Sequence, residues 1–257
     1  MMNRIGFTAL SVVLVAATLL PSCATTTFPN FSHWDSIPSI ATFPAKKTPA
    51  VIHRASRGTE TDSAYRHRAQ QCRQRPDIEW GAYHFCTGAP VQTQLSLALD
   101  RVGHSPGAAN RTLMVFDFEK NVKGANDYMR VADLAELIRR FHARTGVYPV
   151  LYVNPGWFSR RLATDSYSSA DRAVIRKCPL WTSAYRGKPS KVKGFPSWTI
   201  WQYSGDASLP SYGDGRISPS YPRGIPGVGS KLEMNLYRGS VESLRSFWGR
   251  HSIPTRF

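Results

Sequence analysis

Apolar strand patterns and helix patterns alternate along the middle of the chain, and this order restricts the fold more than any other feature. The predicted strands are Ala50–Ala55, Glu79–Cys86, Thr112–Glu119 and Pro149–Asn154, and the helices between them are Asp62–Arg73, Pro90–Val102 and Tyr128–Thr145. Such alternation favours parallel strands covered by helices, with functional residues at the carboxyl ends of the strands. A single α/β barrel commonly has the size of this 257-residue chain.

The pattern changes beyond Asp171, where short aromatic strands follow one another without clear helices between them. The predicted elements are strands at Leu180–Tyr185, Ser197–Tyr203 and Leu232–Tyr237, a loop rich in Gly, Pro and Ser at Gly205–Ser230, and a last helix at Val241–Trp248 capped by Ser240. Helices are therefore expected to cover the first strands of the sheet more than the last.

Two acidic residues, Asp117 and Glu119, stand at the end of the apolar run Thr112–Phe116. Side chains alternate faces along a strand, so these two point the same way, with backbones roughly 6.6 Å apart. Such a pair can have separated pKa values, one group staying protonated while the other is ionised. Glycoside cleavage needs such a pair, because the leaving oxygen accepts a proton while positive charge builds on the sugar ring. A solvated or salt-bridged strand end, paired with Lys120 and Lys123, is the alternative.

The first residues predict export from the cytoplasm. Arg4 forms a short basic region, and Ile5–Leu20 is apolar but short for a membrane span. The segment Leu20-Pro-Ser-Cys23 resembles a bacterial lipoprotein cleavage box, so residues 1–23 are a candidate signal peptide and Cys23 a candidate acylation site. An acylated Cys23 would anchor residues 24–257 to a membrane of the cell envelope. Ordinary cleavage near Ser22–Ala24, which gives a soluble secreted protein, is the alternative.

The remaining cysteines are Cys72, Cys86 and Cys178, which permit one disulfide and one spare thiol in an oxidising compartment. The sequence does not select the pair. The seven histidines include no His-x-x-x-His or His-Glu-x-x-His arrangement, and the cysteine spacings match no metal site. The sequence therefore predicts no metal or other cofactor.

The formal net charge is +16, which favours binding to polyanions such as nucleic acid, acidic glycans or an anionic membrane face. A nucleic-acid-binding protein is expected to carry a known module or a dense basic stripe with interleaved aromatics. Lys and Arg are instead scattered along this chain. The composition thus predicts a cationic envelope protein that works near an acidic polymer, with no specific nucleic-acid partner, and it specifies no oligomeric state.

Eight short motifs follow one another along the chain. They are Asn30-Phe-Ser-His-Trp34, Val51-Ile-His-Arg-Ala-Ser-Arg-Gly58, Gly81-Ala-Tyr-His-Phe85, Asp117-Phe-Glu119, Tyr148-Pro-Val-Leu-Tyr152, Leu180-Trp-Thr-Ser-Ala-Tyr185, Trp201-Gln-Tyr203 and Glu233-Met-Asn235. In this order they resemble the glycoside hydrolase family 25 lysozymes, the Chalaropsis-type muramidases. The resemblance implies a flattened, TIM-like α/β barrel of five β/α units followed by three strands. It also implies hydrolysis of the β-1,4 bond between N-acetylmuramic acid and N-acetylglucosamine in the glycan strands of peptidoglycan.

The family positions also imply roles for single residues. Glu119 corresponds to the general acid and Asp117 to its partner carboxylate, and Tyr83 and Tyr152 are expected near the sugar. Further substrate-binding candidates near strand ends are Asn30, Trp181, Tyr185, Gln202, Glu233 and Asn235. The aromatic residues can stack on sugar rings, although barrels also bury aromatics for packing alone. His84 lies on the opposite strand face from Tyr83, so it is either a core histidine or a site residue.

Two positions depart from the family pattern. Asn30 stands where the first strand of the family normally bears an Asp, and an amide cannot serve as a nucleophile or base. Glu233 replaces an Asp of the last strand, which keeps the charge and extends its reach by one methylene.

A mechanism remains available without a carboxylate at position 30. In this hypothesis Glu119 protonates the glycosidic oxygen, and Asp117 assists either the 2-acetamido group of the substrate or an attacking water. Asn30 then hydrogen-bonds the acetamide. The alternative is a catalytically weakened or inactive lipoprotein that has the same fold and binds cell-wall glycan. A nucleic-acid-binding protein is a further alternative, supported only by net charge, and salt-sensitive retention on DNA would favour it.

Overall fold

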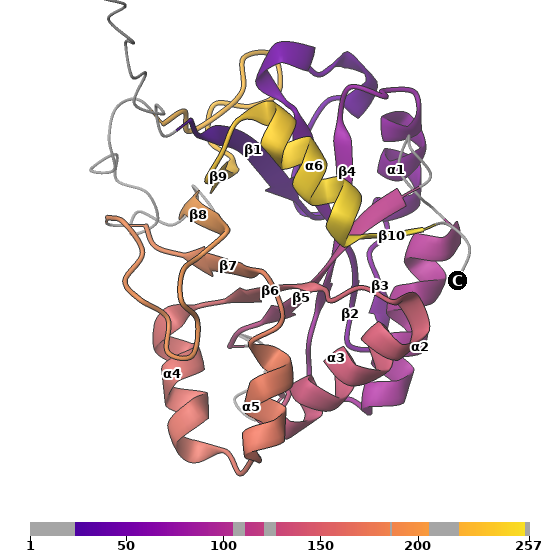
Figure 1. The fold of residues 1–257 in the computed structure, drawn as a ribbon. Coiled ribbons are helices and arrows are strands. Elements are labelled where there is room, and N and C mark those ends of the chain that lie inside the picture. Colours follow the sequence, from indigo (N-terminus) through magenta and orange to yellow (C-terminus); the bar gives the residue numbers. More distant parts are fainter. Residues whose placement is uncertain (1–23, 105–110, 121–126, 186, 206–220, 255–257) are drawn as a thin grey trace, which may run out of the picture.

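Eight strands join edge to edge and close into a barrel in the computed structural model, which describes residues 24–104, 111–120, 127–185, 187–205 and 221–254 (Figure 1). The barrel strands are β1 (Thr26–Phe31), β2 (Ala50–Arg57), β4 (Glu79–Phe85), β5 (Arg111–Phe118), β6 (Val150–Val153), β7 (Leu180–Ser183), β8 (Ile200–Ser204) and β9 (Glu233–Tyr237). The predicted signal segment with Cys23, and residues 206–220 of the predicted loop, lie outside the described residues.

Strand β1 closes the barrel because it pairs on both of its edges. It runs parallel to β2, with Asn30 opposite Ile52, and antiparallel to β9, with Asn30 opposite Glu233. The strands from β1 round to β8 are parallel, and β9 is the antiparallel strand between β8 and β1. Two short strands, β3 (Glu60–Thr61) and β10 (Ser252–Pro254), pair with β2 and β5 outside this ring. Closure therefore places the first and last strands of the barrel, β1 and β9, side by side, with Asn30 next to Glu233.

Helices cover the outer face of the barrel (Figure 1). They are α1 (Tyr65–Arg73), α2 (Val91–His104), α3 (Val131–Thr145), α4 (Pro155–Thr164), α5 (Ser169–Ile175) and α6 (Val241–His251), with short 3-10 turns η1 (Ile40–Thr42) and η2 (Ala45–Lys47) after β1. Each of β1, β2, β4, β5 and β6 is followed by helical structure, whereas β7, β8 and β9 follow one another without a helix. The predicted architecture of five β/α units followed by three strands is therefore confirmed.

Helix α3 begins three residues later than predicted, at Val131 instead of Tyr128. The backbone N–H of Val131 donates to the carboxylate of Asp165 at 3.0 Å, so a residue beyond α4 satisfies the first turn. The helix ends as predicted at Gly146, whose φ of +76° is the left-handed conformation that glycine adopts most easily. The start of this helix was thus decided by a long-range contact and its end by local sequence.

Two helices, α4 and α5, were not predicted from the sequence. Their signals are local: Asn154 accepts a hydrogen bond from the N–H of Trp157 with Pro155 in the first turn, and Ser168 with Asp171 forms a capping box. Both helices are short, so each contains too few apolar residues to show a clear helical period in the sequence. The regular alternation of strand and helix therefore continues through α5, slightly later along the chain than the predicted change at Asp171.

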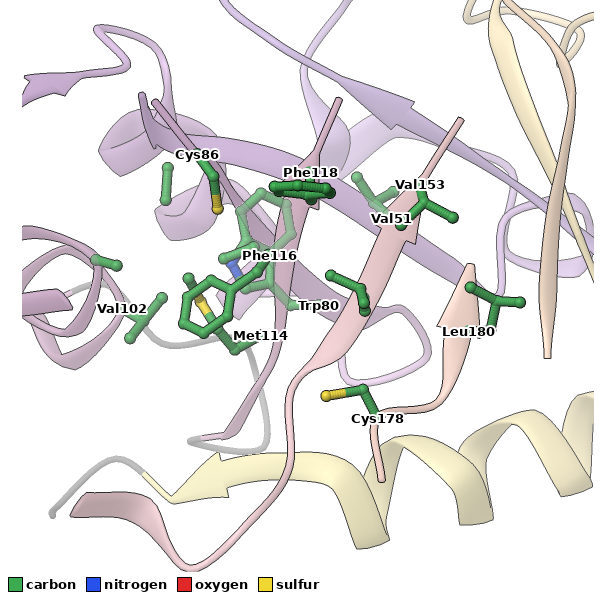
Figure 2. Packing of buried hydrophobic residues seen from close by; sticks show 14 of the residues in the cluster. Val51, Trp80, Cys86, Val102, Met114, Phe116, Phe118, Val153, Cys178 and Leu180 are labelled. Carbon is green, nitrogen blue, oxygen red and sulfur yellow. The ribbon is translucent and has the colours of Figure 1, made fainter. Parts of the chain in front are cut away.

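Alternation along β5 separates two cores. Leu113 and Val115 are fully buried in the cluster inside the barrel. Met114, Phe116 and Phe118 belong to the larger cluster between the barrel and its helices, which Figure 2 shows from close by. This parity directs the next odd-numbered side chains after Val115 toward the inside of the barrel and its open end.

The three cysteines at positions 72, 86 and 178 are buried free thiols, so the disulfide that the sequence permitted among them is not formed. Each is part of the outer core, and burial raises the pKa of the Cys72 thiol to about 12. They pack as small apolar side chains. In the part of the chain that the structure describes, no helix is long and apolar enough to cross a membrane.

Candidate active site

A cleft of about 480 Å³ opens at the carboxyl ends of the parallel strands. Nine of the ten predicted catalytic and substrate-binding residues line it: Asn30, Tyr83, Asp117, Glu119, Tyr152, Trp181, Tyr185, Gln202 and Glu233. The tenth, Asn235, is fully buried and contacts Asn30 instead of lining the cleft. The topology thus gathers residues from β1, β4, β5, β6, β7, β8 and β9 at one end of the barrel.

Asp117 and Glu119 lie at the end of β5 and both face the cleft. Asp117 is 7% exposed, and its Oδ1 atom has no hydrogen-bond partner among the described residues. Burial raises the pKa of Asp117 well above its ordinary value, the negative charges of Glu119 and Glu233 raise it further, and Arg54 lowers it. Burial also raises the pKa of Glu119 to about 7. The two carboxyl groups therefore retain a proton near neutral pH.

Arg54 is the cation that lowers the pKa of Asp117, and sequence reasoning did not select it. Its Nε donates to Asp62 Oδ2 at 2.9 Å, and its guanidinium also lies 2.5 Å from Nδ1 of His33. Asp62 is 2% exposed, so the ion pair is shielded from water. These contacts hold one positive charge at the cleft wall, where it favours the ionised form of Asp117.

Asn30 is held by a network of amide and carboxylate groups. Its Oδ1 accepts hydrogen bonds from Asn235 Nδ2 at 2.9 Å and from Gln202 Nε2 at 3.2 Å. Its Nδ2 donates to Glu233 Oε2, which also accepts from Gln202 at 3.3 Å. These contacts use one of the two N–H bonds of the Asn30 amide and fix which way the amide points. The two departures from the family pattern, at positions 30 and 233, therefore contact each other directly.

The hydroxyl groups of Tyr152 and Tyr185 extend this network. Both donate to Gln202 Oε1 at 2.7 Å, which orients the Gln202 amide toward Asn30. Burial raises the pKa of Tyr152 well above its ordinary value, so the phenol stays a donor. Trp181 packs edge-on against Tyr152, with ring centroids 4.9 Å apart. The predicted aromatic residues thus both line the cleft and pack on one another.

His84 is a core histidine, which settles the alternative that the sequence left open. It is fully buried, with Nδ1 2.8 Å from Ser56 Oγ and Nε2 3.1 Å from Gln94 Oε1. Burial lowers the pKa of His84 to about 4. Its neighbour Tyr83 faces the cleft, as the alternation along β4 predicts.

Replacing Asn30 by Asp is expected to destabilise the protein above neutral pH by about 1–3 kcal/mol. The new carboxylate would lose the hydrogen bond to Glu233 Oε2 and face a second negative charge. Repulsion raises the folded-state pKa values of such a pair, so the destabilisation is present at high pH and disappears as pH falls and one group takes a proton. Urea unfolding at about pH 5 and about pH 8 measures both effects.

The double variant Asn30→Asp/Glu233→Gln is the matched control, because the Gln amide can donate to the new carboxylate. It is expected to recover most of the stability lost by the single variant at high pH. Equal stability of Asn30→Asp and the unmodified protein at about pH 8 would contradict the pairing.

Seven further residues line the cleft without having been predicted: Ser32, Trp34, Asp35, Arg54, Phe85, Asn154 and Lys231. Five of them lie inside or next to the motifs that carry the family resemblance: Ser32, Trp34, Asp35, Arg54 and Phe85. The motifs could therefore have indicated these residues. Lys231 precedes the last strand, and only the folded chain places it at the cleft. Among the described residues, no group of three His, Cys, Asp or Glu side chains is arranged to hold a metal ion.

Comparisons with known proteins agree with this geometry. The family model described as glycosyl hydrolases family 25 matches residues 30–212. Lysozyme M1 of Streptomyces globisporus is 29% identical over 174 residues, which are 64% of this chain and 51% of that protein. N,O-diacetylmuramidase of Chalaropsis sp is 39% identical over 67 residues, 25% of this chain and 29% of that protein. The matched regions thus span about half and about a third of these two relatives.

Solved structures share the fold. The bacterial lysozyme from Streptomyces coelicolor has a TM-score of 0.63 and 21% sequence identity, with 88% of this chain and 98% of that chain covered. A family GH25 lysozyme from Aspergillus fumigatus has a TM-score of 0.62 and 21% identity, with 88% and 99% covered. At this identity the likeness concerns the fold alone.

Proposed function

Because the chain belongs to glycosyl hydrolases family 25, we propose that it hydrolyses the β-1,4 bond between N-acetylmuramic acid and N-acetylglucosamine in peptidoglycan. The observation that supports this most directly is the pair Asp117 and Glu119, two carboxyl groups with raised pKa values facing one cleft. The names of the relatives, a lysozyme and a muramidase, agree with the proposal.

Glu119 is the general acid in this proposal. It is the more exposed of the two carboxyl groups, and a pKa of about 7 leaves a large protonated fraction at neutral pH. Its proton moves to the glycosidic oxygen as the bond from that oxygen to the sugar breaks. The departing chain leaves as an alcohol, and positive charge develops on the sugar ring that remains.

Asp117 is the assisting carboxylate. Ionised Asp117 then acts in one of two ways: it accepts a proton from a water whose oxygen bonds to the anomeric carbon, or it accepts a hydrogen bond from the N–H of the 2-acetamido group while the oxygen of that group bonds to this carbon, from which water later displaces it. Its unpartnered Oδ1 and the nearby cation Arg54 suit this role. The second N–H of Asn30 is then a donor for the acetamide oxygen, and Glu233 and Gln202 hold that amide in place.

Mass spectrometry of peptidoglycan fragments tests the proposal. Incubation with the protein is expected to release muropeptides with new reducing N-acetylmuramic ends. Fragments with new reducing N-acetylglucosamine ends would contradict the bond assignment. Retention on purified peptidoglycan without any released fragment would instead support the alternative, a glycan-binding protein, which the amide at position 30 favours.

The rate of hydrolysis is expected to fall as pH rises through about 7, because Glu119 then loses the proton that it must donate. The expected decline in kcat/KM is about tenfold per pH unit above that value. Reducing-end assays from about pH 5 to about pH 9, with circular dichroism at each pH to verify folding, measure it. A rate that stays constant up to about pH 9 would exclude Glu119 as an acid with this pKa.

The setting of this activity follows from the sequence alone and stays a prediction. Export would bring the protein to peptidoglycan, and acylation of Cys23 would tether it to a membrane of the envelope. The net charge of +16 would favour its accumulation near acidic wall polymers.

A further inference from the structure

Trp34 is the exposed large apolar side chain of the described residues, at 71% exposure, and it lines the same cleft as Asp117 and Glu119. Single exposed apolar side chains are common on protein surfaces and need no function by themselves. This one differs because it lines a polar cleft whose other aromatic side chains are buried or half-buried. An indole ring offers a broad π face that packs against the C–H face of a sugar ring.

The turn that carries Trp34 is held firmly. Ser32 donates its backbone N–H to Asp35 Oδ2 at 2.7 Å, and Asp35 donates its own to the carbonyl of Ser32 at 3.1 Å. Arg68 of α1 donates to the carbonyl oxygens of Ser32 at 2.7 Å and of Asp35 at 2.6 Å. Both ends of the turn are therefore hydrogen-bonded to helix α1.

His33, the residue before Trp34, is also held in place by a hydrogen bond. His33 donates its backbone N–H to Asp62 Oδ2 at 3.0 Å, and its ring packs against the indole at an interplanar angle of 38°, with centroids 4.3 Å apart. Asp62 is buried and is the partner of Arg54 at the cleft wall. The turn thus loses little freedom when a ligand packs on the indole, which reduces the entropic cost of binding.

Trp34 lies away from the bond that is cut. It stands four residues after Asn30, on the turn that follows β1, and is 71% exposed, whereas Asn30 and Asp117 are 3% and 7% exposed. The indole therefore lies at the outer rim of the cleft, whereas the groups placed at the reacting bond lie at its buried floor. A sugar ring on the indole therefore lies farther from the cleft floor than the ring that Asn30 and Asp117 contact in the proposed mechanism.

We propose that Trp34 forms a stacking site for an additional sugar ring of a glycan strand, so that binding strengthens once the strand is long enough to extend from the cleft floor to the indole at the rim. This inference rests on the proposed function for the identity of the strand. The cleft is then expected to bind long strands more tightly than short ones, because a short fragment can bind at Asp117 and Glu119 without contacting the indole.

Calorimetric titration of soluble, peptide-free glycan strands of defined length tests the site. The Glu119→Gln background is used so that the strands stay intact during the measurement. Adding Trp34→Ala is expected to weaken the binding of long strands by roughly tenfold and that of the shortest binding strand by much less. Trp34→Phe keeps an aromatic face and is expected to retain most of the affinity. Trp34→Leu keeps apolar bulk without a π face and is expected to resemble Trp34→Ala.

Equal weakening at every strand length, or unchanged affinity for long strands, would overturn the stacking site. In the catalytically intact protein, Trp34→Ala is expected to raise KM for long strands more than it lowers kcat. A protein that binds strands but releases no new reducing ends would refute the proposed function while leaving the length dependence of binding as a test of Trp34.

Discussion

Replacing Glu119 by Gln is expected to lower the rate of peptidoglycan hydrolysis by roughly 10³-fold or more, while the fold and glycan binding are retained. Gln has the size of Glu but no proton to transfer at neutral pH, so the leaving oxygen departs without neutralisation. Loss of the Glu119 charge should also lower the pKa of Asp117, because that charge is one of the causes that raise it. Zymography and a reducing-end assay measure the loss.

Glu60→Gln is the matched control for this variant. It makes the same chemical change at a residue whose side chain is 76% exposed and which does not line the cleft. Its activity is expected to equal that of the unmodified protein. Clearing of peptidoglycan by Glu119→Gln at the unmodified rate would remove Glu119 from the mechanism.

Replacing Asp117 by Asn is expected to lower kcat by roughly 10²–10³-fold, with a smaller effect on KM. The substitution keeps the shape of the side chain but removes the negative charge that stabilises the developing cation or orients its attacking group. Steady-state kinetics on soluble glycan strands measure kcat and KM separately. A variant with unchanged kcat and a raised KM would show that Asp117 binds substrate without assisting the reaction.

Added azide separates the two routes open to Asp117. If the carboxylate activates water, azide can attack without a base, and glycosyl azide should form and partly restore the rate of Asp117→Asn. If the acetamido group of the substrate is the internal nucleophile, azide should leave the rate of the variant unchanged. Mass spectrometry of the products identifies the azide adduct.

Several parts of the site could be predicted from local sequence. The parity of β5 placed Asp117 and Glu119 on one face, and the parity of β4 separated Tyr83 from His84. These predictions succeeded because alternation of side chains is a property of any strand and does not depend on what surrounds it. The end of α3 at Gly146 was predictable for a similar reason, since a left-handed residue closes a helix locally.

Other parts were not predicted, either because they depend on contacts between distant segments or because the local pattern is short. The sequence permitted a disulfide among Cys72, Cys86 and Cys178, but pairing needs suitably placed Cβ atoms, and the fold buries all three as free thiols. The helices α4 and α5 were missed because each is too short for a clear periodicity. The candidate contact of Asn235 with substrate was replaced by a contact with Asn30, because β9 places it below the cleft floor.

The sequence by itself determined the α/β class, the order of the motifs and the facing carboxylates of β5, since periodicity and spacing act within one strand or helix. Only the tertiary structure decided how the amide at position 30 is used. Barrel closure sets Asn30 beside Glu233, 203 residues away along the chain, and turns two apparent departures into one hydrogen-bonded pair. The same closure presents Trp34 at the cleft on a turn held by Arg68. Such contacts depend on which strands become neighbours, and no local pattern of residues encodes that choice.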